Sequence, residues 1–590
     1  MSVTRSSQGN ETGMWPSWSR QCPPIRTESD GTIRIRKYGA QFSTQEIRDL
    51  FYPPPLLRHI FTERILSTEI GAAIEGLDEA KKDLLAQQVL GLDPTTPGTY
   101  IQVFVILKLI FQLHKLPEFI CAGVSDQELP LYCDRAQQEE PLFYGKSKIG
   151  NSWKPLPDGL LDAFFARSLF RREQYNVVVP VFDNQSAPYD FDWDQVLPIR
   201  KITRDEASTE PQGLIGSYGS VSKVQIHPLC HSFNDAFKFA EGPDGEMYFA
   251  LKELHNANSD SFRKEVEMLR RFHNTKHPHL VTLLASYTHQ NRHYLIFPWA
   301  THDLRSYWEK EQPTPDSENV DLVQWICKQL WKLSDAVSHI HLLDEDTNVP
   351  EETRLYGRHG DLKSENILWY KSKTGFGNLV ITDMGLSKTH RFESRTYVPQ
   401  HQVIATRRYQ PPEVEYENGK MGRTFDIWTL GCMFLEFLSW LHGGFKALQN
   451  MEDSMRASSI RRRTETNEYF EWVYVEEVEY YTVRVKKVVT KLIETLRRDS
   501  SQFTYDLLDI IENRMLVVDR DDRISAKELV EKMKDLDDRC GGDNGWAYCT
   551  QKENRQARAH KPKLQKREFR KDLKTGGKDN VPRVHLGEFR

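Results

Sequence analysis

Apolar residues recur at helical spacing through much of the first third of the chain. Three segments place apolar side chains three and four positions apart, with Pro and Gly between them: PPLLRHIFTERIL, LDEAKKDLLAQQVLGL and TYIQVFVILKLIFQL. The pattern predicts a helical, globular domain over about residues 36–195. The stretch before it, residues 1–35, is polar and rich in Ser, Pro and Arg, so we expect it to be disordered.

The pattern changes after about residue 200. The segment MYFALKEL alternates with strand character, SFRKEVEMLRRF has helical spacing, and FDIWTLGCMFLEFLSWL is apolar enough to be a buried central helix. An insertion covers about residues 443–500. Within it, EWVYVEEVEYYTVRVKKVV fits a strand or a helix equally well.

Composition and charge narrow the class of protein. The chain has 590 residues, of which 28% are charged and 39% hydrophobic, and its net charge is −5. These values are typical of a soluble globular protein with more than one domain, and they give no strong attraction to nucleic acid. The eight cysteines are scattered without a metal-type pair of pairs, so we expect reduced thiols. The N-terminus lacks an apolar signal core, and the best apolar run contains Lys108 and is too short for a bilayer, which predicts an intracellular protein, cytoplasmic or nuclear, with no membrane partner.

The most informative motif lies between Tyr356 and Leu368 and reads YGRHGDLKSENIL. Its acid, lysine and amide have the spacing that phosphoryl transfer from a magnesium nucleotide requires. Asp361 is expected to accept the proton of an attacking hydroxyl, Lys363 to steady the transferring phosphoryl group, and Asn366 to hold magnesium. The motif resembles the catalytic loop of eukaryotic-type protein kinases.

The same family has a glycine-rich hairpin that covers the nucleotide phosphates, and QGLIGSYGSVSKV resembles it. Gly216, Gly219 and Val221 occupy positions of that motif, whereas Leu214 stands where the family has its first glycine. The resemblance implies nucleotide contacts from these residues and from Ile215.

Two charged residues downstream match the family's nucleotide anchor. Ala250-Leu251-Lys252 resembles the V-A-I-K strand, which implies that Lys252 contacts the α- and β-phosphates. Glu265 lies in the helical segment SFRKEVEMLRRF, where the resemblance implies an ion pair with Lys252. Helical spacing predicts that the apolar side chains of this segment face a core: Phe262, Val266 and Leu269.

The segment HYLIFPWATHDL resembles the kinase hinge that receives adenine. Phe297 matches the gatekeeper, and Pro298 falls where the family uses only a backbone carbonyl. Ala300 falls where both N–H and C=O are needed. The predicted nucleotide-binding residues also include Leu368, just after the catalytic loop. A buried pair of strands without a ligand is the alternative interpretation of the hinge segment.

Other kinase-like motifs follow in the family's order. Asp383-Met384-Gly385 resembles D-F-G, which implies that Asp383 chelates magnesium, and Met384 replaces phenylalanine. Glu413, in RRYQPPE, and Arg523, in DRDDRIS, are expected to form a structural ion pair. Asp426, at the start of the predicted central helix, receives no chemical role.

Gly360 departs from the family, which commonly has arginine before the catalytic Asp to receive a phosphorylated loop residue. Any loop phosphorylation is therefore expected to act elsewhere. Lys363 and Thr406 match the pattern of Ser/Thr kinases, and several phrases resemble a kinase subgroup common in filamentous fungi. Because the catalytic residue types are complete, an active enzyme is favoured over a pseudokinase scaffold with weak nucleotide binding.

The resemblance implies an α+β, bilobal protein-kinase fold over about 200–540, with a small β-rich lobe, a helical lobe, and ATP and Mg2+ as cofactors. Its substrates would be Ser/Thr hydroxyls of proteins, and the domain over 36–195 would serve a regulatory partner. Residues 541–590 are expected to form a basic, disordered tail. From about residue 551 it is rich in Lys and Arg with almost no apolar side chains, which favours a solvated tail over a nuclear-localisation signal or a nucleic-acid contact.

Overall fold

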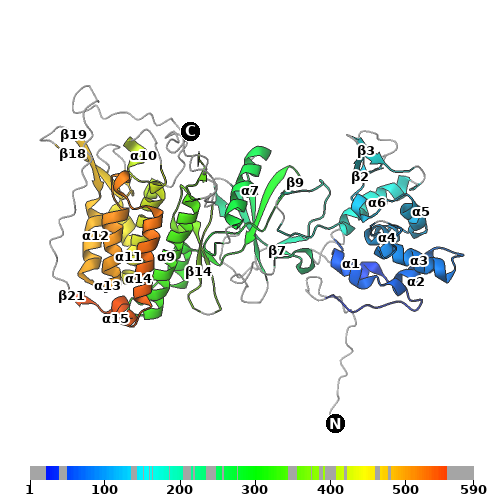
Figure 1. Cartoon of the computed structure of the whole chain (residues 1–590), viewed down its shortest axis with the longest axis horizontal. Helices are drawn as coiled ribbons and strands as arrows, with labels where there is room; N and C mark the ends of the chain where they lie inside the picture. The colour runs from blue at the N-terminus through cyan, green and yellow to red at the C-terminus, as the bar shows by residue number, and fades with distance from the viewer. Residues whose placement is uncertain are drawn as a thin grey trace, which may run out of the picture. The chain divides into compact units, whose positions relative to one another are not determined.

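The computed structural model divides the chain into two compact units (Figure 1). Unit 1 comprises Met1–Phe262 and Leu284–Trp299, and unit 2 comprises Arg263–Leu283 and Ala300–Arg590. The residues that the structure describes are 22–38, 50–96, 98–133, 143–149, 152–157, 160–161, 164–184, 187–202, 214–216, 219–233, 247–255, 258–274, 277–342, 355–373, 375–383, 390–391, 407–416, 422–458, 465–475 and 480–554.

The first part of unit 1 is a helical domain, in agreement with the predicted helices of this region. Its helices are α1 (Pro54–Ile60), α2 (Glu63–Ala73), α3 (Glu79–Leu90), α4 (Ile101–Leu109), α5 (Leu116–Cys121) and α6 (Phe164–Val177), with short 3-10 turns at Ile35–Tyr38, Leu113–Lys115 and Asp126–Glu128. Helix α4 is apolar on nearly every side, and its residues 103–107 are fully buried, so it forms the centre of the domain core. The sequence pattern did not predict the small antiparallel sheet of strands β1 (Tyr132–Cys133), β2 (Phe143–Ile149) and β3 (Ser152–Pro155).

This domain begins earlier in the chain than the sequence indicated. Ile33, Ile35 and Tyr38 are buried in its core, and the backbone N–H of Ile33 donates a hydrogen bond to Glu69, 2.5 Å away. The carboxylate of Glu69 also pairs with Lys108 of α4. The prediction of disorder for residues 1–35 is therefore wrong for residues 22–35, because two isolated isoleucines anchor a stretch whose average composition is polar; residues 1–21 lie outside the described residues.

A carboxylate distant in sequence caps the N-terminus of α4. Oδ1 of Asp126 accepts hydrogen bonds from the backbone N–H groups of Gln102 (2.9 Å) and Val103 (3.0 Å), and Oδ2 accepts one from the Thr99 hydroxyl (2.9 Å). The first N–H groups of a helix have no partner within the helix, so this carboxylate satisfies two of them.

We expect Asp126→Ala to lower the free energy of unfolding by about 1–3 kcal/mol, because the substitution leaves partly buried N–H donors without an acceptor. Urea unfolding, followed by a probe that reports this domain, measures the change. The exposed neighbour Gln127 supplies the matched control, and Gln127→Ala should unfold at the wild-type urea concentration. Equal stability of the two variants would contradict the capping role.

The rest of unit 1 is built on a seven-stranded sheet. Its strands are β4 (Tyr189–Asp190), β5 (Ile199–Lys201), β6 (Leu214–Gly216), β7 (Gly219–Ile226), β8 (Phe249–Leu254), β9 (Ala285–His289) and β10 (Arg292–Pro298). They lie in the order β4-β9-β10-β8-β7-β5, and β6 pairs with β7. All pairs are antiparallel except β4 with β9. The predicted strand MYFALKEL is confirmed as β8.

The helical domain and the turn after β7, Pro228–Cys230, share a buried contact within unit 1. Phe51, which precedes α1, packs with Val179 and Cys230 in one small apolar cluster, and its ring meets that of His227 edge to face at 5.6 Å. The chain that leaves α6 then supplies β4 and β5 to the two edges of the sheet. The helical domain thus contacts the turn after β7, and the segment that follows α6 contributes two strands to the sheet.

Unit 2 is mainly helical. Helix α7 (Ser259–Asn274) runs across the division between the units. The other helices are α8 (Leu304–Ser306), α9 (Val320–His341), α10 (Glu413–Tyr416), α11 (Thr424–Met455), α12 (Lys487–Arg498), α13 (Gln502–Ile510), α14 (Ala526–Cys540) and α15 (Gly545–Thr550). Residues 425–441 of α11 are all buried, which confirms the predicted central helix.

Short strand pairs complete unit 2. One sheet has three strands: β11 (His302–Asp303), β13 (Ile367–Tyr370) and β14 (Asn378–Ile381). Four further sheets have two strands each. They pair β12 (Leu355–Tyr356) with β15 (His390–Arg391), β16 (Ala457–Ser458) with β17 (Glu465–Thr466), β18 (Phe470–Val475) with β19 (Tyr480–Val485), and β20 (Asp499–Ser500) with β21 (Glu553–Asn554). The insertion that fitted a strand or a helix is therefore a hairpin, β18–β19, followed by α12.

The packed part of unit 2 ends later than the predicted boundary at residue 540. Cys549 and Thr550 of α15 are buried, and β21 pairs with β20. The prediction of a disordered tail from 541 is wrong as far as residue 554, and residues 555–590 lie outside the described residues. Among the helices that the structure describes, none is both long and apolar enough to cross a membrane.

Candidate active site

Three predicted catalytic side chains meet in the loop between β12 and β13. Nζ of Lys363 lies 2.9 Å from Oδ2 of Asp361. The side-chain amide of Asn366 donates to the backbone carbonyl of Asp361 (2.8 Å) and to its Oδ2 (3.2 Å). Asp361 and Asn366 are 8% and 7% exposed, so the acid is held in one place by two donors. A carboxylate held in this way can accept a proton from a hydroxyl placed beside it.

The backbone of this loop is fastened by a residue to which the sequence analysis gave no role. Asp426, fully buried at the start of α11, accepts hydrogen bonds from the backbone N–H groups of His359 and Gly360 and from the ring of His341, each at 2.9 Å. Burial alone would raise the pKa of Asp426, but these hydrogen bonds outweigh it and hold the pKa below its usual range. The sequence does contain a sign of this role: Asp426 is a carboxylate in an apolar helix, and a buried charge requires hydrogen-bond partners.

Gly360 has a conformation that suits glycine. Its φ is +83°, in the left-handed region that a side chain disfavours. The ring of the preceding His359 accepts the N–H of Asp361 at Nδ1 (3.2 Å), which leaves the ring proton on Nε2 to donate to the carbonyl of Thr382 (2.9 Å). The catalytic loop is thereby tied to the residue that precedes Asp383.

The two predicted metal ligands lie at the same end of one strand pair. Ile367 of β13 faces Ile381 of β14, so Asn366 and Asp383 both adjoin the end of the ladder where these strands meet. Asp383 has φ +62°, which is uncommon for a residue with a side chain and is frequent at functional sites. Met384 lies outside the described residues. An amide oxygen and a carboxylate are ligands that suit Mg2+, so the donor set fits that ion.

In unit 1, four predicted nucleotide-binding residues share one face of the sheet. Val221 is paired with Lys252, and Ala250 with Phe297. Paired residues, and residues two apart on one strand, point to the same side. All four are half-buried, whereas residues of the opposite face, such as Phe249, are in the core. This face of the sheet therefore keeps a lysine and three apolar side chains partly open to solvent.

The glycine-rich hairpin is formed by β6 and β7, and the backbone of β7 lies very close to that of β8 at Gly219. A Cβ on Gly219 would lie 2.4 Å from the backbone oxygen of Glu253, so only glycine fits β7 against β8 at this point. Gly216 pairs with Gly219 at the end of the hairpin. Ile215 pairs with Ser220, one position out of step with Val221, so its register does not match that of the shared face.

The remaining residues of the predicted hinge and nucleotide site are Pro298, Ala300 and Leu368. Pro298 ends β10, and the ladder continues through Trp299, whose N–H donates to Tyr248 (3.1 Å). Ala300 and Leu368 both belong to unit 2.

The predicted helix that carries Glu265 is α7, and its predicted core residues, Phe262, Val266 and Leu269, are buried. Glu265 itself is half-buried. Lys252 and Glu265 belong to different units, and their ion pair stays a prediction.

The predicted ion pair of unit 2 is confirmed. Both guanidinium Nη atoms of Arg523 lie 2.6 Å from the two carboxylate oxygens of Glu413, and both side chains are fully buried. Nε of Arg523 donates to the carbonyl of Val517 (2.7 Å), and its guanidinium lies over the Trp428 ring at 5.0 Å. The pair fixes the start of α10 against the centre of unit 2.

A second buried charge network lies beside the catalytic loop and was not predicted. Arg408 pairs with Glu436 of α11 and with Glu452, 2.5 Å away, and the Tyr409 hydroxyl donates to Glu436 (2.9 Å). The Tyr409 hydroxyl is also 3.4 Å from that of Ser364 in the catalytic loop. Burial raises the pKa of Glu436, and Arg408 only partly offsets this effect. The network holds the segment before α10 next to Ser364 of the loop that carries Asp361.

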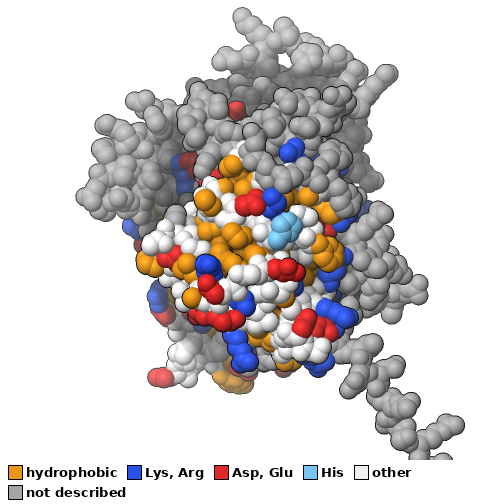
Figure 2. Space-filling model, turned by 90° about the vertical axis from the view of Figure 1, so that its right-hand side faces the viewer, with side chains coloured by type: hydrophobic (Ala, Val, Ile, Leu, Met, Phe, Trp, Pro, Cys, Tyr) orange, Lys and Arg blue, Asp and Glu red, His pale blue; other side chains and the backbone are white. Residues whose placement is uncertain are grey.

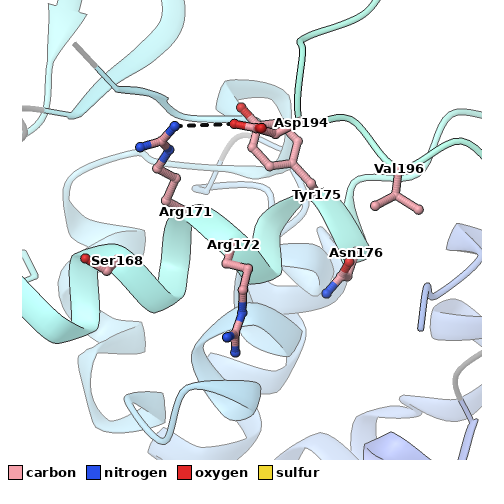
Figure 3. A pocket seen from close by; sticks show the side chains of 7 residues that line it. All are labelled: Ser168, Arg171, Arg172, Tyr175, Asn176, Asp194 and Val196. Carbon is pink, nitrogen blue, oxygen red and sulfur yellow. Dashed lines mark hydrogen bonds and ion pairs between the residues drawn. The ribbon is translucent and has the colours of Figure 1, made fainter. Parts of the chain in front are cut away.

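A pocket of about 420 Å³ in unit 1 lies on α6 and the chain near Asp194 (Figure 3). Its two arginines point in different directions: Arg171 pairs with Asp194 (3.3 Å), and Arg172 contacts Glu173 (2.8 Å). The cations do not converge on one point, so we assign this pocket no ligand.

Comparisons with known proteins show the family to which the chain is similar. A family model described as "Protein kinase domain" matches residues 235–533, just over half of the chain. Cyclin-dependent kinase 2 of Caenorhabditis elegans is 31% identical over 164 residues, 28% of this chain and 39% of that protein. Cyclin-dependent kinase-like 4 of Mus musculus is 27% identical over 215 residues, 35% and 54% of the two chains. Cyclin-dependent kinase 12 of C. elegans is 26% identical over 321 residues, 51% and 38%.

Because the family model covers just over half of the chain, the chain belongs to the protein kinase family. A β-sheet part and a helical part fit the bilobal fold of this family. The chain spans 38 to 54% of the length of the three relatives named above.

Proposed function

We propose that the protein is an ATP-dependent protein kinase that transfers the γ-phosphoryl group of Mg-ATP to Ser/Thr hydroxyls of proteins. One observation carries the proposal: Lys363 and Asn366 hold the carboxylate of Asp361, while Asp426 fastens the loop backbone. This arrangement prepares one acid for proton transfer and surrounds it with the charges that phosphoryl transfer needs.

Each catalytic residue has a distinct part in the proposal. Asp361 accepts the proton of the substrate hydroxyl as its oxygen attacks. Lys363 stabilises the negative charge that develops on the transferring group. Asn366 and Asp383 hold Mg2+, which when bound neutralises charge on the nucleotide phosphates. The contact of Lys363 with Asp361 places its charge beside the acid that is proposed to accept the proton.

Nucleotide binding is assigned to the shared face of the unit 1 sheet. Lys252 binds the α- and β-phosphates, and the apolar side chains of Val221, Ala250 and Phe297 receive the adenine together with Ala300 and Leu368. Gly216 and Gly219 let the hairpin backbone approach the phosphates, and Glu265 pairs with Lys252. We leave Ile215 out of this set because its register partner is Ser220.

The Ser/Thr class rests on Lys363 and on the relatives, which are named as cyclin-dependent kinases. The resemblance to a kinase subgroup of filamentous fungi stays a prediction. Because Gly360 carries no side chain, the catalytic loop offers no arginine at this position to a phosphorylated residue. Regulation is proposed to act through the helical domain, which contacts the turn that follows strand β7.

The helical domain also presents apolar side chains to solvent. Figure 2 shows orange side chains gathered among charged ones on one face of the molecule. Leu84, Leu92 and Phe111 of this domain are 47%, 63% and 86% exposed. We propose that a regulatory protein partner contacts this domain.

A nucleotide-binding experiment tests the assignment of Lys252. We expect Lys252→Met to weaken Mg-ATP binding by about 10- to 100-fold, because a charge-assisted hydrogen bond contributes about 1.5–3 kcal/mol. The shift of the thermal unfolding midpoint with Mg-ATP concentration measures the affinity. Lys201→Met, at the exposed end of β5, is the matched control and should bind as the wild type does.

Phosphate incorporation into a degenerate peptide library, read by mass spectrometry, tests turnover and acceptor type together. We expect phosphoserine and phosphothreonine from the wild type and almost none from Lys252→Met. A wild-type protein that binds Mg-ATP but transfers no phosphate would contradict the enzyme and support the pseudokinase scaffold, which the leucine at position 214 would explain by keeping the hairpin away from phosphate.

A further inference from the structure

A cluster of two imidazoles and a carboxylate lies in unit 2 apart from the catalytic loop. His277 follows α7, and Asp335 and His339 lie one turn apart on α9. Nε2 of His277 is 3.3 Å from Oδ2 of Asp335, and Nδ1 of His339 is 3.6 Å from Oδ1 of the same carboxylate. One ligand atom of each side chain lies within 4.8 Å of the others. Two segments far apart in the sequence thus bring three donors to one point.

The backbone orients both imidazoles. The carbonyl oxygen of Asp335 lies 2.9 Å from Nδ1 of His339, which keeps that ring beside the carboxylate. The N–H of His279 donates to Nδ1 of His277 (3.2 Å), and Nε2 of His277 therefore carries the ring proton and donates to Asp335. Binding a cation through Nε2 requires this proton to move to Nδ1, which breaks the hydrogen bond from the N–H of His279. In metal sites the non-ligating ring N–H commonly donates to a backbone carbonyl, as Nδ1 of His339 can to Asp335, which leaves Nε2 of His339 for the ion.

The charges around the cluster allow a cation to enter. Nζ of Lys332 is 3.5 Å from Oδ2 of Asp335 and 3.6 Å from the centre of the Trp331 ring. If Asp335 binds an ion in place of Lys332, the ammonium group therefore keeps its cation–π contact with Trp331.

Solvent reaches the cluster from one side. The side chains of Asp335 and His339 are 25% and 29% exposed, whereas His277 is 6% exposed. A hydrated ion can therefore approach from the α9 side and exchange its water for the three donors.

We propose that His277, Asp335 and His339 form a binding site for a divalent transition-metal ion, with Zn2+ as the ion that the donors suit best. Two imidazole nitrogens and one carboxylate oxygen match the ligands and the open fourth position of three-ligand zinc sites, whereas Mg2+ and Ca2+ prefer oxygen alone. The bound ion joins the segment after α7 to α9. Because imidazole must be unprotonated to bind, the affinity decreases in acid.

The test uses the full-length protein, freed of any affinity tag and of metal by a chelator. Isothermal titration with Zn2+ alone should give one tight site, and Zn2+ should raise the thermal unfolding midpoint. His339→Ala and Asp335→Asn should each weaken this site at least tenfold and remove most of the thermal shift.

The matched control is His302→Ala. Nε2 of His302 lies 3.2 Å from a carboxylate oxygen of Glu311, as His277 does from Asp335, but that pair is not part of a three-donor cluster among the described residues. His302→Ala should bind Zn2+ as the wild type does. Equal Zn2+ affinity in His339→Ala, Asp335→Asn and the wild type would overturn the proposal, as would a wild type that shows neither tight binding nor a thermal shift.

Discussion

Asp361→Asn is expected to reduce phosphate incorporation by about 100- to 10,000-fold, the range that a positioned general base contributes. The amide keeps the shape of the side chain but cannot accept the hydroxyl proton. Its oxygen can still accept hydrogen bonds from Lys363 and Asn366, so the loop should keep its conformation. Single-turnover phosphate transfer to a peptide selected from the library measures the loss.

Two further measurements separate chemistry from folding in this variant. The midpoint of thermal unfolding and the affinity for Mg-ATP should stay near the wild-type values, because Asp361 is assigned to the hydroxyl and not to the nucleotide. Glu365→Gln makes the same carboxylate-to-amide change at an exposed position of the same loop and should retain activity. Unchanged transfer by Asp361→Asn would remove Asp361 from the mechanism.

The cluster around Asp361, whose catalytic role is a proposal, could be predicted because its members lie close together in the sequence. Asp361, Lys363 and Asn366 lie within six consecutive residues, and the structure brings their side chains together as the spacing indicated. The four residues of the sheet face were found in the same way, from short motifs on β7, β8 and β10 whose register then aligns them.

The supporting contacts could not be predicted from spacing. Asp426 fastens Gly360 across 66 residues, and Tyr409 reaches Glu436 across 27 residues, so neither partner has a local signature. What the sequence does contain is the anomaly of carboxylates within an apolar helix, which is α11 in both cases. Such residues identify a need for partners but do not identify the partners.

Domain boundaries were missed because they depend on a few contacts and not on average composition. Ile33 is one apolar residue in a polar stretch, and Cys549 belongs to a short helix beyond the last long amphipathic one. Each is buried by side chains that are distant in the sequence, which local composition does not reveal. The hairpin β18–β19 was ambiguous for a related reason, since short apolar runs fit both periods until a partner strand is known.

Arg523→Met is expected to lower the free energy of unfolding of unit 2 by about 3–5 kcal/mol. This is the usual effect of removing one partner from a buried ion pair. The remaining carboxylate of Glu413 would be fully buried without its two hydrogen bonds. Urea unfolding measures the difference. Lys534→Met breaks an exposed pair with Asp538 (2.7 Å) instead and should change the stability by less than about 1 kcal/mol.

A double variant shows whether the destabilisation comes from the stranded charge. Adding Glu413→Met to Arg523→Met removes the buried carboxylate, so part of the lost stability should return, because apolar side chains of similar size can replace a buried ion pair. The alternative is that the losses of unfolding free energy in Arg523→Met and Glu413→Met simply add in the double variant. The two residues would then not act as a pair. The start of α10 would then depend on the Arg408–Glu436 network in the preceding segment and not on this pair.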